Sequence, residues 1–86
     1  MLEIIKELKS KEDSYRSYVK IEVLNLLSKI VKLNRIKNAT KNKLMLIKAD
    51  LIEVPFDYRN PHLGNKCSHD EINSYIKMAL FVLASN

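Results

Sequence analysis

The turn-forming residues of this chain are gathered in one place, and this constrains its fold more than any other feature. The single glycine and both prolines are Pro55, Pro61 and Gly64. An all-β fold needs a turn every ~8–12 residues, usually built with glycine or proline. The sequence therefore argues against an all-β fold and favours helices on both sides of one long loop. Its 86 residues, 47% of them apolar, predict a single helical domain over residues 1–86 with an efficiently packed core.

Apolar residues that recur every three or four positions predict four helical segments, and so an all-α fold, a small four-helix bundle. The helices are expected near residues 2–10, 11–37, 41–54 and 69–85, with a long loop at 55–67. The second helix would be ~40 Å long at 1.5 Å per residue, so its end should project beyond the bundle or bend. Nothing in the sequence requires a break between the first two segments, which leaves one longer helix as the alternative. Thr40 is the expected N-cap of the third helix.

Cysteine usage and hydropathy favour a soluble, cytoplasmic protein. Cys67 is the only cysteine, so no internal disulfide is expected and nothing requires an oxidising compartment. The N-terminal residues alternate charged with apolar side chains and lack the uninterrupted apolar run of a signal peptide. The longest apolar run, Met78 to Ala84, is far shorter than the ~20 residues that span a bilayer. We therefore expect no membrane span.

Positive charge is concentrated in the middle of the chain, in a basic segment at residues 29–48. The net charge is +5, and no acidic residue occurs from Val23 to Ala49. Lys41 and Lys43 are expected in the first turn of the third helix, where free N–H groups attract an anion. The candidates for contacts with nucleic-acid phosphates or other anions are Lys29, Lys32, Arg35, Lys41 and Lys43. The alternative is a solvated, lysine-rich turn, because the segment matches no helix-turn-helix motif and has no aromatic side chain to stack on bases.

Two histidines and the cysteine lie close together near the end of the predicted loop. His62, Cys67 and His69 are weak candidates for zinc ligands, because zinc takes nitrogen and sulfur donors. Their spacing matches no familiar pair of zinc ligands, and a fourth ligand would have to be an aspartate. Ser68 and Glu71 have the spacing of a helix capping box, which explains the same stretch locally. We therefore predict no metal and no cofactor.

No arrangement of residues predicts catalysis. One glycine cannot supply a phosphate-binding glycine loop or a dinucleotide-binding fingerprint. The acidic residues are mostly close to lysines in the sequence, as is usual on solvated helix surfaces. We predict that the protein is not an enzyme.

The predicted loop is the first candidate for a protein-binding surface. Tyrosine and arginine are common at binding hot spots, and proline lowers the entropy lost when a loop becomes ordered. The alternative is that Phe56 and Leu63 fold under the bundle and cover the core, while Tyr58 and Arg59 face outward. The protein-binding candidates are Phe56, Tyr58, Arg59 and His62.

The last helix is a further candidate, because its second half is apolar on all sides. If Phe81 or Val82 is left uncovered, we expect a homodimer through residues 72–84.

These features predict a small non-enzymatic adaptor, inhibitor or regulatory protein whose partner is another protein. The alternative is a nucleic-acid-binding protein that uses the basic segment on phosphates. A small, basic four-helix bundle resembles, in architecture alone, the immunity proteins of bacteriocin producers and small phage regulators. That resemblance implies a role in binding or regulation, and it covers no motif.

Overall fold

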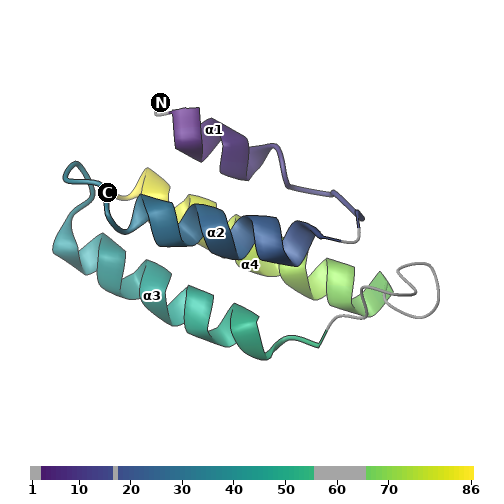
Figure 1. The fold of residues 1–86 in the computed structure, drawn as a ribbon. Helices are drawn as coiled ribbons and strands as arrows, with labels where there is room; N and C mark the ends of the chain where they lie inside the picture. Colours follow the sequence, from purple (N-terminus) through teal and green to yellow (C-terminus); the bar gives the residue numbers. More distant parts are fainter. Residues whose placement is uncertain (1–2, 17, 56–65) are drawn as a thin grey trace.

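In the computed structural model of the protein, residues 3–16, 18–55 and 66–86 are described, and all of their regular structure is helical (Figure 1). The predicted all-α, four-helix fold is confirmed. The described helices are α1 (Glu3–Lys9), α2 (Val19–Ile30), α3 (Asn38–Glu53) and α4 (Lys66–Ala84).

The helices pack as a closed ring. Each helix contacts the next one in the chain, and the last helix, α4, also contacts the first, α1. In Figure 1 the short α1 lies on one side of α2 and α4, and α3 lies on the other. The seam between α1 and α2 is therefore opposite the seam between α3 and α4. No helix within the described ranges is both long and apolar enough to cross a bilayer.

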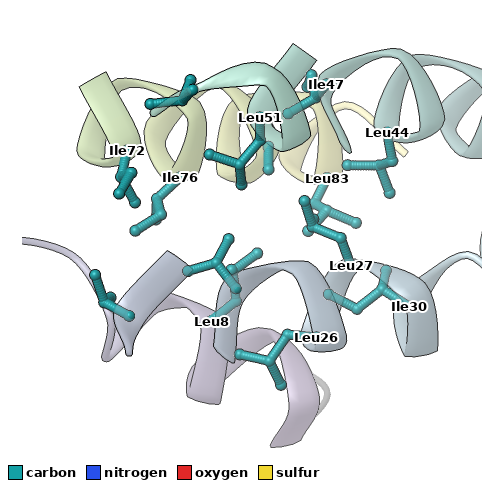
Figure 2. Close-up of a cluster of buried hydrophobic side chains, with 14 of the residues drawn as sticks. Leu8, Leu26, Leu27, Ile30, Leu44, Ile47, Leu51, Ile72, Ile76 and Leu83 are labelled. Carbon is teal, nitrogen blue, oxygen red and sulfur yellow. The ribbon is translucent and has the colours of Figure 1, made fainter. Parts of the chain in front are cut away.

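One hydrophobic core fills the ring, and Figure 2 shows its side chains pointing toward one another from all four helices. The spacing of the buried residues follows the helical period, so each helix presents one apolar face inward. The helical residues that carry the core are Leu8 in α1, Val19, Val23, Leu26, Leu27 and Ile30 in α2, Leu44, Ile47 and Leu51 in α3, and Ile72, Ile76, Ala79 and Leu83 in α4.

The second helix is much shorter than predicted. Helix α2 contains 12 residues, so the predicted helix over residues 11–37 is wrong. Residues 10–13 form turns, and Asp13 has a φ of 59°, which ends a right-handed helix and which aspartate tolerates better than most residues. The Asp13 N–H donates a hydrogen bond to Asn73 Oδ1 of α4 at 2.9 Å. Because this partner is distant in the sequence, the local apolar period could not reveal the break.

The connection from α2 to α3 also departs from the predicted helix. After Ile30 the chain turns, and Ile36 enters the core. Asn86 holds this connection, because its Nδ2 donates to the Arg35 carbonyl (3.2 Å) and its Oδ1 accepts from the Lys37 N–H (2.8 Å). One buried side chain and two hydrogen bonds thus determine the turn.

Helices α3 and α4 both begin earlier than predicted. Helix α3 starts at Asn38, after Lys37 in an extended conformation, so Thr40 is a buried residue inside the helix and is not its N-cap. Helix α4 starts at Lys66, which places Ser68 within its first turn, so the predicted capping box is wrong. The residues that lengthen α3 and α4 at their N-termini include no proline or glycine, so their helix propensity does not oppose the longer helices.

A buried lysine caps the end of α3. The Lys20 side chain of α2 is only 9% exposed, and its Nζ donates hydrogen bonds to the backbone carbonyls of Ile52 (3.0 Å) and Val54. The last carbonyls of a helix lack partners within the helix and carry partial negative charge, so a cation stabilises them. Lys20 therefore joins α2 to α3 through backbone carbonyls, and no described carboxylate pairs with it.

Candidate protein-binding surface on helices α3 and α4

Helix α4 carries a second apolar stripe that the core does not cover. Phe81 is 75% exposed and Met78, one helical turn before it, is 44% exposed. On the neighbouring α3, Leu46 is 68% exposed. Fully exposed large apolar side chains are unremarkable one at a time, but a group of them on adjacent helices is typical of an interaction site. We call Leu46, Met78 and Phe81, with the two hollows described below, the Phe81 surface.

The first hollow lies between α3 and α4 and has a volume of about 560 Å³. We call it the α3–α4 hollow. Its apolar lining comes from both helices, and a lysine from each helix completes it, Lys43 from α3 and Lys77 from α4. No acidic side chain lines it among the described residues. The apolar lining residues are Leu46, Ile47, Met78, Phe81 and Val82.

A second hollow of about 660 Å³ lies between α1 and the end of α4, and we call it the α1–α4 hollow. It is also mainly apolar, with side chains such as Ile5, Ile36 and Leu80, and it is bordered by Arg35. Phe81 lines both hollows, so its exposed ring stands on the ridge between them. One aromatic side chain therefore has an apolar hollow on each side.

The lysines of the α3–α4 hollow are exposed and form no ion pair with any described acid. The ion pairs within the described residues all lie in the first quarter of the chain. Glu22 binds both Lys11 (2.9 Å) and Arg16 (2.9 Å), and Lys6 contacts Glu3 at 3.6 Å. Lys43 and Lys77 are thus available to acids of a partner.

Three of the candidate phosphate-binding residues line three different hollows. Lys29 lines a small hollow between α1 and α2 that also contains Glu7 and Glu22. Arg35 lines the α1–α4 hollow, and Lys43 lines the α3–α4 hollow on the far side of the ring. Three of the five cations therefore face three different seams.

The helix start also changes the environment of the lysines in α3. Because α3 begins at Asn38, Lys41 is its fourth residue and Lys43 its sixth. The prediction that both lie in the first turn, beside free N–H groups, is wrong. Lys32 is exposed in the turn that follows α2.

The loop candidates Phe56, Tyr58, Arg59 and His62 lie outside the described residues. Within the described parts, no group of three or more histidine, cysteine or acidic residues is arranged to hold a metal ion. His69 is buried, and its ring lies 5.1 Å from the ring of Tyr15 at an angle of 56°. Cys67 is in the first turn of α4.

The titratable groups with shifted pKa values have structural partners. The Tyr15 hydroxyl donates to Asp70 Oδ1 at 3.2 Å, and partial burial together with this carboxylate raises the pKa of Tyr15. The hydrogen bond from Lys11 lowers the pKa of Glu22, and the nearby Arg16 adds to the effect. Both groups tie the connection between α1 and α2 to its neighbours, which accounts for their shifts without a catalytic role.

Sequence reasoning identified Phe81 and Val82 but missed Leu46, Met78 and Lys77. The available signal was the run of apolar residues from Leu44 to Ile47, because one helical face cannot bury four successive side chains. Leu44 and Ile47 take the buried positions, so the two residues between them face outward.

Comparison with models of known protein families, with curated proteins and with solved structures finds no match to this chain. The functional proposal therefore depends on the surface itself.

Proposed function

We propose that the protein is a small, non-enzymatic adaptor, inhibitor or regulator that acts by binding another protein through the Phe81 surface. One observation carries this proposal: Phe81 is 75% exposed between two apolar hollows. Aromatic side chains beside pockets dominate the energetics of many protein interfaces. Covering this ring and its neighbours removes apolar surface from water, and that favours association.

The polar groups of the described residues support a binding role over catalysis. Perturbed pKa values often mark active sites, but the shifted groups here, Tyr15 and Glu22, are engaged in contacts that hold α1 and α2 in place. Neither group lines the α3–α4 hollow or the α1–α4 hollow.

A comparison of two variants tests the proposal. Phe81→Gln removes the aromatic ring with no change of charge and keeps a good helix former. Ile21→Gln is the matched control, because Ile21 is also an exposed apolar residue (42%) but lies on α2, away from both hollows. In affinity capture from the native cells, we expect a partner protein that binds the wild type and Ile21→Gln but is lost with Phe81→Gln. Identical protein sets for all three baits would contradict the proposal.

Nucleic-acid binding is the second candidate function, and one observation favours it. Among the described residues, the cations of the basic segment form no ion pair with an acid. Binding to duplex and single-stranded nucleic acid at ~50 and ~200 mM salt tests it, because five phosphate contacts predict a loss of ~100-fold or more between them. Lys29→Glu/Lys32→Glu should abolish such binding while Phe81→Gln leaves it intact. Weak, salt-independent binding would remove this candidate.

A further inference from the structure

The α3–α4 hollow has the shape and size to accept the side chains of a helix. Its lining on α4 extends from Lys77 to Val82, which is ~7.5 Å along the axis at 1.5 Å per residue. Two side chains one helical turn apart, at positions i and i+3 or i+4, are separated by a similar distance. A volume of about 560 Å³ falls within the range of small binding pockets. The flexible Met78 side chain can adapt its shape to what enters.

The charges of the hollow select the chemistry of its occupant. Lys43 and Lys77 come from the two helices that form its walls, and no described acid lines it or pairs with them. An amphipathic helix with its apolar stripe in the hollow would bring its flanking residues toward the lysines. Glutamate or aspartate at those flanks would complement them, whereas lysine would be repelled.

The same charges disfavour a second copy of this chain. In a two-fold symmetric dimer the same patch occurs on both subunits, so the four lysines of two hollows would be brought together. No described acid of the hollow is present to compensate for them. A homodimer through residues 72–84 would therefore place like charges opposite one another.

We propose that the α3–α4 hollow binds an acidic amphipathic helix of a partner protein. Phe81 is the main apolar contact, and Lys43 and Lys77 contact the acidic residues that flank the apolar stripe of that helix. The inference rests on the proposed function and specifies the partner. A protruding row of side chains fits a hollow between two helices better than a flat lipid surface does, so a membrane is the less suited occupant.

Three synthetic peptides of ~18 residues test this inference. All three share leucines at i, i+3, i+4 and i+7, and the flanking positions are glutamate in the first, glutamine in the second and lysine in the third. Fluorescence anisotropy measures each Kd at ~50 and ~200 mM salt. Binding of the protein to vesicles of phosphatidylcholine with phosphatidylserine is measured for comparison, and sedimentation velocity measures self-association of the protein.

We expect the glutamate peptide to bind about fivefold more tightly than the glutamine peptide, and the lysine peptide to bind most weakly. The preference should shrink at the higher salt concentration. Lys43→Glu/Lys77→Glu should reverse the order, so that the lysine peptide binds best. Lys32→Glu/Lys37→Glu is the matched control, because these exposed lysines make the same change in net charge outside the hollow. Phe81→Gln should weaken binding of every peptide by about tenfold or more. Circular dichroism confirms that each variant is folded.

The contrary outcomes separate this inference from the proposed function. Equal affinity for all three peptides would overturn the acidic helix as the occupant and leave an apolar protein-binding surface. No binding of any peptide with a Kd below ~1 mM would also overturn the inference. If a dimer then forms and Phe81→Gln abolishes it, the occupant is a second copy. Tighter binding to vesicles than to the glutamate peptide would overturn both the inference and the proposed function.

Discussion

Two regions of this small bundle use their side chains in opposite ways. The connection between α1 and α2 is held by side-chain contacts within the molecule. Asp13 is hydrogen bonded to Asn73, Tyr15 to Asp70, and Glu22 to two cations. On the Phe81 surface the apolar side chains face solvent, and Lys43 and Lys77 have no described acid beside them.

The difference separates residues that the fold explains from residues that it does not. The polar contacts of the α1–α2 connection join it to α2 and α4. Among the described residues, the ring of Phe81 and the lysines of the α3–α4 hollow have no comparable partners, and they line the same hollow. A surface whose composition folding does not require is the best place to look for function.

The largest expected effect tests how firmly α1 is attached to the bundle. Leu8 is completely buried and is the α1 residue in the core, so Leu8→Ala should lower the free energy of unfolding by about 2–5 kcal/mol. Leu46→Ala makes the same chemical change on the Phe81 surface and should alter that free energy by less than ~0.5 kcal/mol. Urea denaturation of both variants measures the contrast. Equal losses would mean that the Phe81 surface is part of the core, and the comparison would fail.

The next effect concerns the buried cation that joins α2 to α3. Lys20→Met keeps most of the apolar stem but removes the donor to the Ile52 and Val54 carbonyls. We expect a loss of about 1.5–3 kcal/mol in the free energy of unfolding, because hydrogen bonds from a charged group are among the stronger ones. Lys32→Met, at an exposed lysine, is the control and should cost less than ~0.5 kcal/mol. Similar midpoints of urea denaturation for the two variants would contradict a capping role of Lys20.

A smaller effect on the free energy of unfolding is expected from the charge of Glu22, and it should depend on pH. The hydrogen bond from Lys11, with Arg16 nearby, lowers the pKa of Glu22 in the folded protein below its ordinary value of 4.5. A carboxyl group with a lowered folded pKa stabilises the fold at pH values above its ordinary pKa, and this stabilisation disappears as the pH falls through the folded pKa. Glu22→Gln should therefore be less stable than the wild type near neutral pH, by under ~1 kcal/mol for a partly exposed pair. In urea denaturation the difference between the two proteins should shrink as the pH falls from neutral through the folded pKa of Glu22, and a difference that does not depend on pH would point to another cause.

The helical period predicted the fold class and most of the core, because burial of one helical face leaves a regular trace in the sequence. Leu44, Ile47 and Leu51 follow that rule. The connections before and after α2 could not be predicted, since distant residues hold them: Asn73 binds Asp13 in the first connection, and Asn86 binds Arg35 and Lys37 in the second.

The candidate site was only partly predictable for a related reason. The surplus of apolar residues in α4 identified Phe81, but which helix lies beside it depends on the ring order of the bundle. That order places Lys43 and Lys77 on the same hollow and Lys29 on a different one. The charge pattern along the sequence suggested one basic segment and could not show that its lysines line different hollows.

The smallest expected effect on stability is the most informative about function. Phe81 is 75% exposed, so Phe81→Gln removes little buried surface, and glutamine is the better helix former. The free energy of unfolding should change by less than ~0.5 kcal/mol in urea denaturation, while binding to the glutamate-flanked peptide falls by about tenfold or more. If the variant loses stability and binding together, Phe81 supports the fold and the difference between the two regions disappears. If stability is unchanged and binding is lost, the ring is dispensable for folding and needed for recognition, because only an external partner then accounts for its contribution.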